Sequence, residues 1–415
     1  MKNVATVSSV TILSPQIAFG TKANSAIRLG IIGCGNRGNA VVASMVNGTN
    51  THIIAMADLF EDKLLESKGK FNSLNTAKGG SEIEKLKMYL GSKSYLKLIE
   101  DKDVDAVLIS SPAYTHPEFL AAAVAAGKHV YCEKPAATDV DGCKRVSQIG
   151  KDGNGKVSIA IGFQIRYATP YIEMVKRIQR GDIGEIVNAQ VYYFGNEKYF
   201  IPPKGNSFDE YRIRNHYHYT SLSGGILLDQ GIHMIDTCNW VLQKNPMQAS
   251  GSGNRKGGLD FGDTYTNYQI IYEYPDNINV SFHSTKMGPH GGDVCARFIG
   301  TKGTAEAHYS RGVFIEGDNK WDGVLPSGTQ PTAEQRAAGI FNSALQDADS
   351  NKVKTFIQSI ETGKYLNETE SAAASTLIAI LGANAAVSKE IITWDEMIFS
   401  KGQMDAGLNL KQFDR

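Results

Sequence analysis

Short apolar runs alternate with amphipathic stretches from residue 27 to about residue 161. The runs IRLGIIG, HIIAMAD, DAVLISSP and HVYCEKP are apolar almost throughout and predict four strands. RGNAVVASMVNG and HPEFLAAAVAAG have helical spacing and end in glycine. Apolar strands separated by helices are typical of a parallel sheet covered on both faces. The longer, more polar stretch 60–95 predicts a helix and a short strand near Met88.

Beyond about residue 161 the segments alternate or are rich in aromatic and β-branched residues. IVNAQVYYFG, TNYQIIYEYP, INVSFHST and VCARFIGT predict a largely antiparallel sheet, with turn signals at PDN and TKG. Helical spacing returns in TPYIEMVKRIQRG, LLDQGIHMIDTCNWVLQ and ESAAASTLIAILGANAAVSKE, and residues 251–263 predict a glycine-rich loop. The predicted fold class is α/β, with domains at 27–158 and 159–415 after an N-terminal segment of residues 1–26.

The amino-acid composition limits which classes of binding partner are expected. A chain of 415 residues suits two domains, and 42% hydrophobic with 21% charged residues is typical of a soluble globular protein. Because Lys+Arg and Asp+Glu both total 43, no net charge attracts nucleic acid or an anionic membrane, and we expect neither as a partner. The five cysteines are scattered without a CxxC pair, which argues against a disulfide framework and a zinc site; we expect no metal.

Residues 4–21 form an uncharged N-terminal run that is too short and too polar for a transmembrane helix. The run resembles the apolar region of an export leader whose basic part is shortened or missing. An arm-like or disordered extension is the alternative interpretation. The leader favours a periplasmic or exported protein, with a cytoplasmic location as the alternative.

GIIGCGNRGNA carries the spacing G-x-G-x-x-G at Gly33, Gly35 and Gly38, between a predicted strand and a predicted helix. Such glycines permit a tight turn and let a pyrophosphate approach the amides at the helix N-terminus. Asp58 ends the next strand, where a dinucleotide-binding fold places the acid that accepts from ribose hydroxyls. Because Asp58 would repel a 2′-phosphate, NAD is preferred to NADP. The expected cofactor-binding residues of this part are Gly33, Gly35, Asn36, Arg37, Gly38 and Asp58.

Two further strands end in chemically distinctive loops, SSPAYTH and EKP. Ligands of parallel sheets bind at the carboxyl ends of the strands, so both loops are expected to face the nucleotide. A lysine in a loop is by default interpreted as a surface residue. The position of Lys134 after this strand instead predicts a lysine beside the cofactor. His116 is equally well explained as part of a capped helix start. The expected cofactor contacts here are Ser111, Pro112, His116, Glu133 and Lys134, and Pro135 makes a cis bond a possibility.

GGILLDQGIHMIDTCNWVL places Asp229, His233 and Asp236 at a spacing that puts all three on one face of a helix. A histidine on an apolar helix is more often a core residue, but this one has acidic neighbours. A histidine titrates near neutrality and a carboxylate one turn away can orient it. The pattern therefore makes His233 a candidate for proton transfer.

The order and spacing of these motifs resemble the Gfo/Idh/MocA oxidoreductases, named for glucose–fructose oxidoreductase, inositol dehydrogenase and a rhizopine-catabolism protein. The resemblance covers about residues 27–400 and rests on GIIGCGNRG, VDAVLISSP, AGKHVYCEKP, GFQIRY, GDIGEI, LLDQGIHMID, GTKGTAE and TWDEM. It implies a Rossmann domain followed by an α/β domain with a large open sheet, and a homo-oligomer, dimer or tetramer, formed through that sheet. It also implies substrates that are sugars, cyclitols or their derivatives.

The resemblance implies a role for each matching residue. Lys134 binds the reacting oxygen and stabilises the developing alkoxide, His233 removes the hydroxyl proton as hydride leaves for NAD, and Asp229 orients His233. The expected substrate contacts are Lys134, Arg166, Tyr193, His216, Asp229 and His233, with His218 as a further candidate. For Tyr193, His216 and His218, an ordinary place in a strand or loop is as good an explanation.

Residues 197–220 depart from the family pattern and suggest an insertion that covers the substrate. The preferred function is an NAD-dependent oxidoreductase acting on a secondary hydroxyl or keto carbon of a sugar, glycoside or cyclitol. One alternative is an NAD-dependent glycosidase that oxidises C3 transiently and cleaves by elimination, against which the intact EKP argues. The other is a non-catalytic sugar and nucleotide sensor, against which the intact Lys134, Asp229 and His233 argue.

Overall fold

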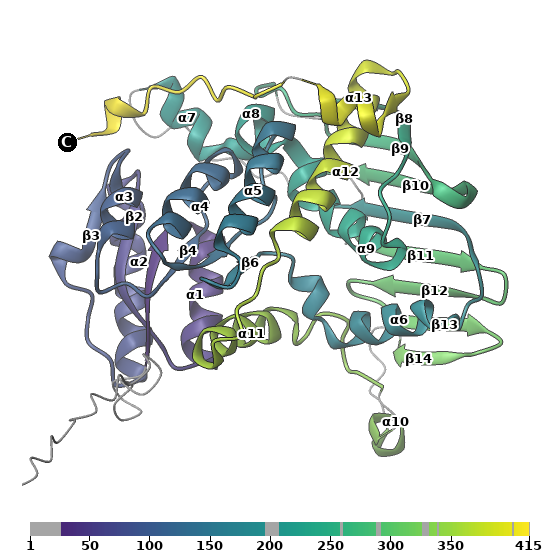
Figure 1. Ribbon diagram of the computed structural model, residues 1–415, viewed down its shortest axis with the longest axis horizontal. Helices are drawn as coiled ribbons and strands as arrows, with labels where there is room; N and C mark the ends of the chain where they lie inside the picture. The colour runs from purple at the N-terminus through teal and green to yellow at the C-terminus, as the bar shows by residue number, and fades with distance from the viewer. Residues whose placement is uncertain are drawn as a thin grey trace, which may run out of the picture.

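The computed structural model describes residues 26–195, 207–257, 260–287, 292–325, 332–337, 340–400 and 402–414. The expected leader within residues 1–26 therefore lies almost entirely outside the described residues, as does the first part of the expected insertion at 197–220. Two sheets organise the described chain, and the helices pack on and between them (Figure 1).

The first sheet is entirely parallel and has the strand order β3-β2-β1-β4-β5-β6. Its strands are β1 (Ile27–Ile32), β2 (Thr51–Asp58), β3 (Met88–Leu90), β4 (Ala106–Ile109), β5 (His129–Cys132) and β6 (Ile159–Ile161). Its helices are α1 (Asn36–Gly48), α2 (Glu61–Ala77), α3 (Ser94–Glu100), α4 (His116–Ala125) and α5 (Val140–Gly153). The sequence-based prediction of a parallel sheet with a short strand near Met88 is confirmed. Because β6 pairs with β5, this sheet extends three residues beyond the expected boundary at 158.

Continuous apolar strands explain why this sheet is covered on both faces. Leu29 and Ile31 on β1 are buried in one hydrophobic cluster, whereas Ile32 on the same strand is buried in the other. At the N-terminus of α5, Asp139 accepts a hydrogen bond from the amide of Gly142 at 2.7 Å, which caps the helix. The result is a rigid edge from which the loops after β1, β4 and β5 project.

The second sheet is mixed and has the order β14-β13-β12-β11-β7-β10-β9-β8-β15. Its strands are β7 (Ile186–Phe194), β8 (Gln248–Asn254), β9 (Asn267–Tyr274), β10 (Ile278–Thr285), β11 (Asp293–Gly300), β12 (Gly303–His308), β13 (Val313–Gly317), β14 (Trp321–Val324) and β15 (Ile392–Thr393). All its pairs are antiparallel except β7 with β10. The mostly antiparallel sheet is confirmed, but the expected loop at 251–263 begins later, because residues 251–254 pair with β9 as the end of β8.

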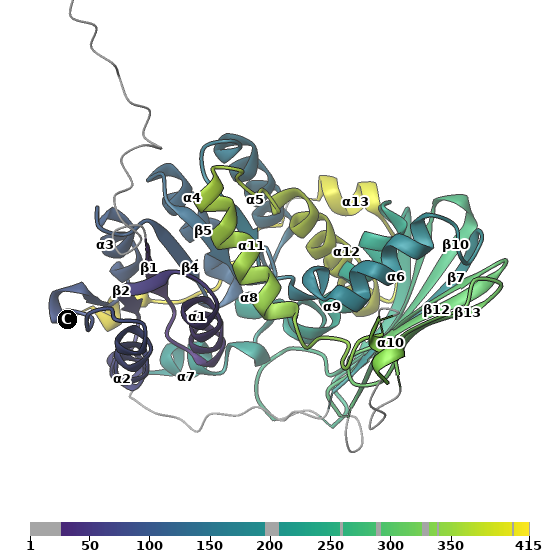
Figure 2. The ribbon, with the colours of Figure 1, turned by 90° about the horizontal axis from the view of Figure 1, so that it is seen from below.

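Helices cover one face of this second sheet (Figure 2). The remaining α-helices of the described residues are α6 (Thr169–Gln179), α7 (Phe208–Arg214), α8 (Thr220–Ser223), α9 (Ile232–Leu242), α10 (Ala333–Ala337), α11 (Ala348–Thr362), α12 (Thr369–Ser388) and α13 (Trp394–Phe399). Residues of α12 and of both domains belong to one hydrophobic core, and α12 packs on α5, β8 and α9. By length and hydropathy alone α12 would suit a bilayer, yet 67% of its most apolar window is buried inside the fold, as in a core helix.

Candidate active site

A cleft of about 1010 Å³ lies where the carboxyl ends of the first sheet meet the second domain. Its walls are formed by the loops after β1, β2, β4 and β5, by the π-turn Leu227–Gly231 that precedes α9, and by the C-terminal tail. Most of the site residues expected from the sequence line it: Gly33, Gly35, Asn36, Arg37, Asp58, Ser111, Pro112, His116, Glu133, Lys134, Tyr193, His216, Asp229 and His233. Gly38 lies beneath the loop, and Arg166 and His218 are not among the lining residues.

The three glycines after β1 meet three different steric demands. Gly33 has a φ of +92°, and a Cβ there would lie 2.6 Å from the carbonyl oxygen of Ser110. A Cβ on Gly38 would lie 2.4 Å from the carbonyl oxygen of Gly33, so this glycine lets α1 approach the strand. A Cβ on Gly35 would meet nothing within 4 Å, so its backbone is open for a ligand to approach. This division of roles fits the pyrophosphate of a dinucleotide at the start of α1.

Asp58 lies at the end of β2 and binds the backbone of the glycine loop. Its Oδ2 accepts from the amide of Cys34 at 2.7 Å, and its Oδ1 accepts from the amide of Phe60 at 2.9 Å. Burial raises the pKa of Asp58, and these two backbone hydrogen bonds oppose the increase. Each carboxylate oxygen has a second lone pair, so the residue can hold the loop and still accept from a ribose hydroxyl.

The EKP loop is fixed on both sides of Lys134. The buried Glu133 accepts from Arg37 Nε at 2.8 Å, and Arg37 also pairs with Asp349 at 3.0 Å. The Lys134–Pro135 bond is cis, as the sequence suggested. Glu133 and Arg37, both expected to contact the cofactor, thus bind each other where they line the cleft. Their pairing ties the EKP loop to the first turn of α1.

Lys134 reaches across the cleft to the second domain. Its Nζ donates to the carbonyl oxygen of Asp229 and lies 3.2 Å from the Oδ1 of the same residue. The Lys134 side chain is 14% exposed and that of Asp229 is 18% exposed, so the pair is largely shielded from water. Burial raises the pKa of Asp229, but the charges of Lys134 and Lys286 outweigh it and the pKa lies below its ordinary value. Asp229 is therefore an ionised partner of Lys134.

His116 joins the loops after β4 and β5. Its Nδ1 lies 2.7 Å from the carbonyl oxygen of Pro135, and its Nε2 lies 2.9 Å from that of Ser111. The ring has only 1% exposed surface, and this burial lowers its pKa. A neutral imidazole carries one N–H, so one of these two carbonyls accepts its hydrogen bond. The residue positions both loops and is more than a helix cap.

His233 lines the cleft from the first turn of α9. Its ring makes edge contacts with Phe163 and Tyr309, both at 6.4 Å between centroids, and its buried Nδ1 has no hydrogen-bond partner among the described residues. Burial, followed by the charges of Lys134 and Arg37, holds the pKa of His233 well below its ordinary range. The imidazole is therefore neutral near pH 7 and able to accept a proton.

The predicted orientation of His233 by Asp229 is wrong in this structure, because the carboxylate of Asp229 turns to Lys134. Asp229 lies in the π-turn Leu227–Gly231, and His233 lies in the first turn of α9 that follows it. The Asp229 carboxylate accepts from Lys134, and Nδ1 of His233 has no hydrogen-bond partner among the described residues. Both still face the same cleft.

Arg166 was expected at the substrate end, and the structure corrects this. Its guanidinium binds Asp236 through Nε at 2.9 Å and Nη2 at 2.7 Å, and Asp236 also accepts from Ser375 at 2.7 Å. The pair joins α9 to the GFQIRY segment inside the second domain, and Asp236 is not among the residues that line the cleft. From the same segment it is Gln164 that lines the cleft.

The substrate end of the cleft is polar and aromatic. Tyr193 on β7, His216 and Tyr217 line it, the latter two from the described part of the expected insertion. His216 Nδ1 donates to the carbonyl oxygen of Ile213 at 3.0 Å, which leaves Nε2 as an acceptor, and burial lowers the pKa of this ring to about 4. Sequence reasoning missed five further lining residues. Tyr114 and Gln164 lie within the SSPAYTH and GFQIRY segments, and Tyr217, Ser223 and Lys286 lie outside the motifs.

The C-terminal tail was also missed. It crosses from the second domain back to the first (Figure 1), and residues 408–411 line the cleft. Arg212 on α7 donates to the carbonyl oxygen of Ala406 at 2.7 Å, and Asp209 accepts from the amide of Asn409 at 2.9 Å. At the far end Asp414 accepts from the amide of Ser92 at 2.7 Å. No composition signal marks this segment, since its place depends on contacts with residues hundreds of positions away.

A dinucleotide cradle and a lysine–histidine pair open into one cleft, an arrangement that defines a nicotinamide-dependent oxidoreductase with a separate substrate domain. A family model described as an oxidoreductase family with an NAD-binding Rossmann fold matches residues 27–161. A second model, for the GFO/IDH/MocA C-terminal domain, matches residues 171–306, so that together they cover well over half of the chain. The chain belongs to the Gfo/Idh/MocA family, as the motifs indicated, and its first domain is an NAD-binding Rossmann domain.

Several characterised proteins are similar to the chain along most of their length. Inositol 2-dehydrogenase 2 of Saccharopolyspora erythraea is 24% identical over 347 residues, which span 83% of this chain and 88% of that protein. Inositol 2-dehydrogenase of Rhizobium meliloti is 24% identical over 364 residues, spanning 87% and 96%. These relatives are dehydrogenases that act on a CH–OH group, and the chain is an oxidoreductase of the same family.

Solved structures share the fold. Myo-inositol 2-dehydrogenase from Lactobacillus plantarum superposes with a TM-score of 0.67 at 21% identity, covering 89% of this chain and 99% of that one. A levoglucosan dehydrogenase in complex with NADH and levoglucosan gives a TM-score of 0.68 at 19% identity, again covering 89% and 99%. The predicted Rossmann domain followed by a mostly antiparallel sheet is confirmed by this likeness.

Proposed function

We propose that this protein is an NAD-dependent dehydrogenase or reductase that acts on a secondary hydroxyl or keto carbon of a cyclitol or sugar. The observation that carries the proposal is that Lys134 and His233 line the same cleft as the glycine loop. The lysine supplies a fixed cation and the histidine a neutral base. The inositol dehydrogenases among the relatives and the levoglucosan dehydrogenase structure support polyol substrates.

Lys134 is arranged to bind the reacting oxygen. An ammonium group has three N–H donors, and the carbonyl and carboxylate oxygens of Asp229 take two of them. The third is left for the substrate hydroxyl, whose oxygen becomes negative as its proton leaves. Because this part of the cleft is shielded from water, a positioned cation stabilises the alkoxide more than it would in solution.

His233 then takes the hydroxyl proton. Its lowered pKa keeps the imidazole unprotonated at neutral pH, the state that a base requires. Hydride uptake and donation are the chemistry that bound nicotinamide supplies. In the reductive direction the same two residues act in reverse: His233 returns the proton and Lys134 holds the carbonyl oxygen. Asp229 keeps Lys134 in place, and its negative charge balances the positive charge of the lysine.

The test is an incubation of the purified protein with NAD and a panel of cyclitols, sugars and aryl glycosides. Net NADH is followed by absorbance and released aglycone by chromatography. Stoichiometric NADH with at least one polyol, lost in Lys134→Ala, supports the proposal. Aglycone release without net NADH would replace it with the glycosidase mechanism. NAD binding without any turnover across the panel would point to a sensor.

Two expectations from the sequence stay proposals. We propose self-association through the face of the second sheet that carries no helices in Figure 2. Ile271 is 40% exposed and alternates along β9 with the buried Ile270 and Tyr272, so it points away from the core. Sedimentation of the wild-type protein and of Ile271→Lys tests it, and a monomeric wild type contradicts it.

We also propose export through the N-terminal segment, supported by the uncharged run at residues 4–21. Fractionation of cells that express the full chain tests it, and a wholly cytoplasmic protein contradicts it.

A further inference from the structure

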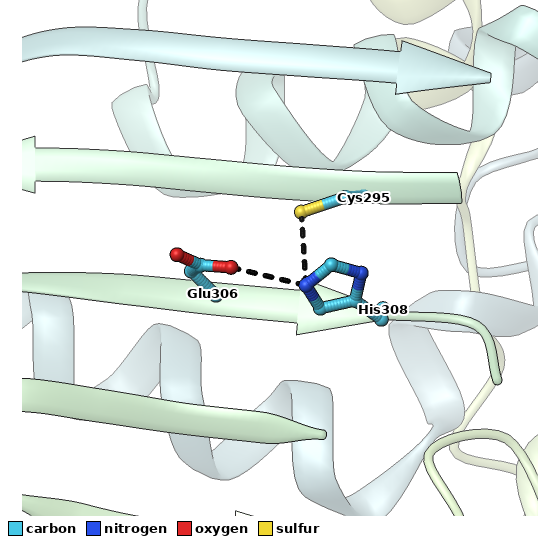
Figure 3. A group of neighbouring side chains, drawn as sticks. All are labelled: Cys295, Glu306 and His308. Carbon is cyan, nitrogen blue, oxygen red and sulfur yellow. Dashed lines mark hydrogen bonds and ion pairs between the residues drawn. The ribbon is translucent and has the colours of Figure 1, made fainter. Parts of the chain in front are cut away.

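A group of metal-ligand side chains lies on the second sheet, among residues that do not line the cleft. Cys295 on β11 is paired across the strands with His308 on β12, and Glu306 lies two residues before His308. Because side chains two apart on a strand share a face, all three project from the same side of the sheet. Figure 3 shows the three side chains directed at one another between neighbouring strands.

The ligand atoms of the group converge. His308 Nε2 lies 3.0 Å from Glu306 Oε2 and 3.5 Å from Cys295 Sγ, and all three lie within 4.8 Å of one another. A tetrahedral zinc ion with bonds of about 2.0–2.3 Å to oxygen, nitrogen and sulfur separates these atoms by roughly 3.3–3.6 Å. The observed distances between the three ligand atoms are close to those that tetrahedral zinc requires. The pairing of β11 with β12 keeps the three side chains at these distances.

The surrounding residues match the outer shell of a metal site. Asp293 Oδ1 lies 3.5 Å from His308 Nδ1, a buried atom without a hydrogen-bond partner among the described residues. A carboxylate there favours the Nδ1–H tautomer, which turns the lone pair of Nε2 toward Glu306 and Cys295. Arg297 holds the Glu306 carboxylate with two hydrogen bonds, from Nε to Oε1 at 2.7 Å and from Nη2 to Oε2 at 3.2 Å. Each carboxylate oxygen has a second lone pair, so Oε2 can still bind a metal. Tyr192 donates to Asp293 Oδ2 at 3.1 Å and so holds that residue.

We propose that Cys295, Glu306 and His308 bind a divalent cation of the zinc class that joins β11 to β12. A thiolate with an imidazole selects Zn²⁺ or Co²⁺ over Mg²⁺ and Ca²⁺, which prefer oxygen ligands. Binding replaces the thiol proton of Cys295, which is released to solvent, and involves no change of oxidation state. The three protein ligands leave one position for water. The alternative is a metal-free cluster held together by the contacts of His308 with Glu306 and Asp293.

The test uses the full chain without a polyhistidine tag, dialysed against a chelator and shown to be folded by circular dichroism. Titration with Co²⁺ is followed by the near-ultraviolet charge-transfer absorption of a cobalt–thiolate bond, and Zn²⁺ is then added in competition. One equivalent of Co²⁺ with this band, displaced by Zn²⁺ and unaffected by Mg²⁺, is the expected result. A folded wild-type protein without the band would overturn the proposal.

Variants assign the ligands. Cys295→Ala should abolish the charge-transfer band, and His308→Gln should prevent binding of the first equivalent. Cys143→Ala, at a buried cysteine of α5, and His283→Gln, at an exposed histidine of β10, are matched controls that should bind as the wild type does. Asp293→Asn, which keeps all three ligands, should weaken Zn²⁺ binding about 10- to 100-fold. Unchanged Zn²⁺ affinity in Cys295→Ala or in Asp293→Asn would contradict the proposal.

Discussion

The EKP loop and the helix that carries His233 face each other across the cleft and differ in how their polar atoms are satisfied. In the loop, Glu133 is paired with Arg37 and Lys134 with Asp229. On the helix, Nδ1 of His233 is buried without a hydrogen-bond partner among the described residues. The loop is therefore organised before any ligand arrives, whereas the histidine is kept neutral by burial and by nearby positive charge. One side of the cleft therefore carries paired charges, and the other carries a neutral imidazole.

The largest expected effect on turnover comes from removing the positive charge of Lys134 in the EKP loop. Lys134→Met should lower kcat by about 10³-fold, because the developing alkoxide loses its fixed cation. Steady-state NADH formation with the best substrate of the panel measures the loss. Lys144→Met, at a half-exposed lysine of α5, is the matched control and should turn over normally. Lys134→Met activity within tenfold of the wild type would remove this residue from the chemistry.

The helix side is tested by His233→Asn and by pH. The substitution should lower kcat about 10²-fold, as expected for loss of a general base. A folded-state pKa below the ordinary value of about 6.5 keeps the base neutral as pH falls through 6.5. The acid limb of kcat/KM for oxidation should therefore lie below pH 6.5 in the wild type and vanish in His233→Asn. An acid limb at or above pH 6.5 would show that the histidine is not held neutral by its surroundings.

A smaller effect is expected from the C-terminal tail. Deletion of residues 402–415 removes the side chains that line the cleft at 408–411 and the hydrogen bonds to Arg212 and Ser92. NAD should then dissociate about tenfold faster, since one wall over the nucleotide is lost, while the chemical step stays as it was. Stopped-flow displacement of bound NADH measures the rate. Equal dissociation rates in both proteins would limit the tail to a structural role.

The smallest effect on turnover is expected at the pair formed by Arg166 and Asp236, which supports the helix from inside the second domain. Asp236→Asn leaves a mostly buried guanidinium without its carboxylate and should lower the free energy of unfolding by about 3 kcal/mol. Turnover of the folded fraction should stay within a factor of two or three. Urea denaturation and kinetics below the transition check both values. A large loss of kcat without loss of stability would return Arg166 to the substrate site.

The features that could be predicted from the sequence are those that a contiguous motif specifies. The turn at Gly33, the acid at Asp58 and the lysine after β5 depend on a strand, a loop and a helix that follow one another, so local spacing specifies them. The orientation of Asp229 could not be predicted this way, since its partner Lys134 lies 95 residues away in the sequence. Arg166 was misplaced for a related reason: its partner Asp236 lies 70 residues away and competes with the cleft for the side chain.

The sequence by itself determined the class of fold, the family, the preference for NAD and the choice of Lys134 and His233 as candidate site residues, both of which line the cleft. These follow from local rules: strand period, glycine conformation and the charge of residues at strand ends. The tertiary structure alone decided which charges neutralise one another, where the tail runs, and that three scattered residues, Cys295, Glu306 and His308, converge on one point. The reason is physical, because pairing of distant strands and burial of charge depend on contacts that no local pattern encodes.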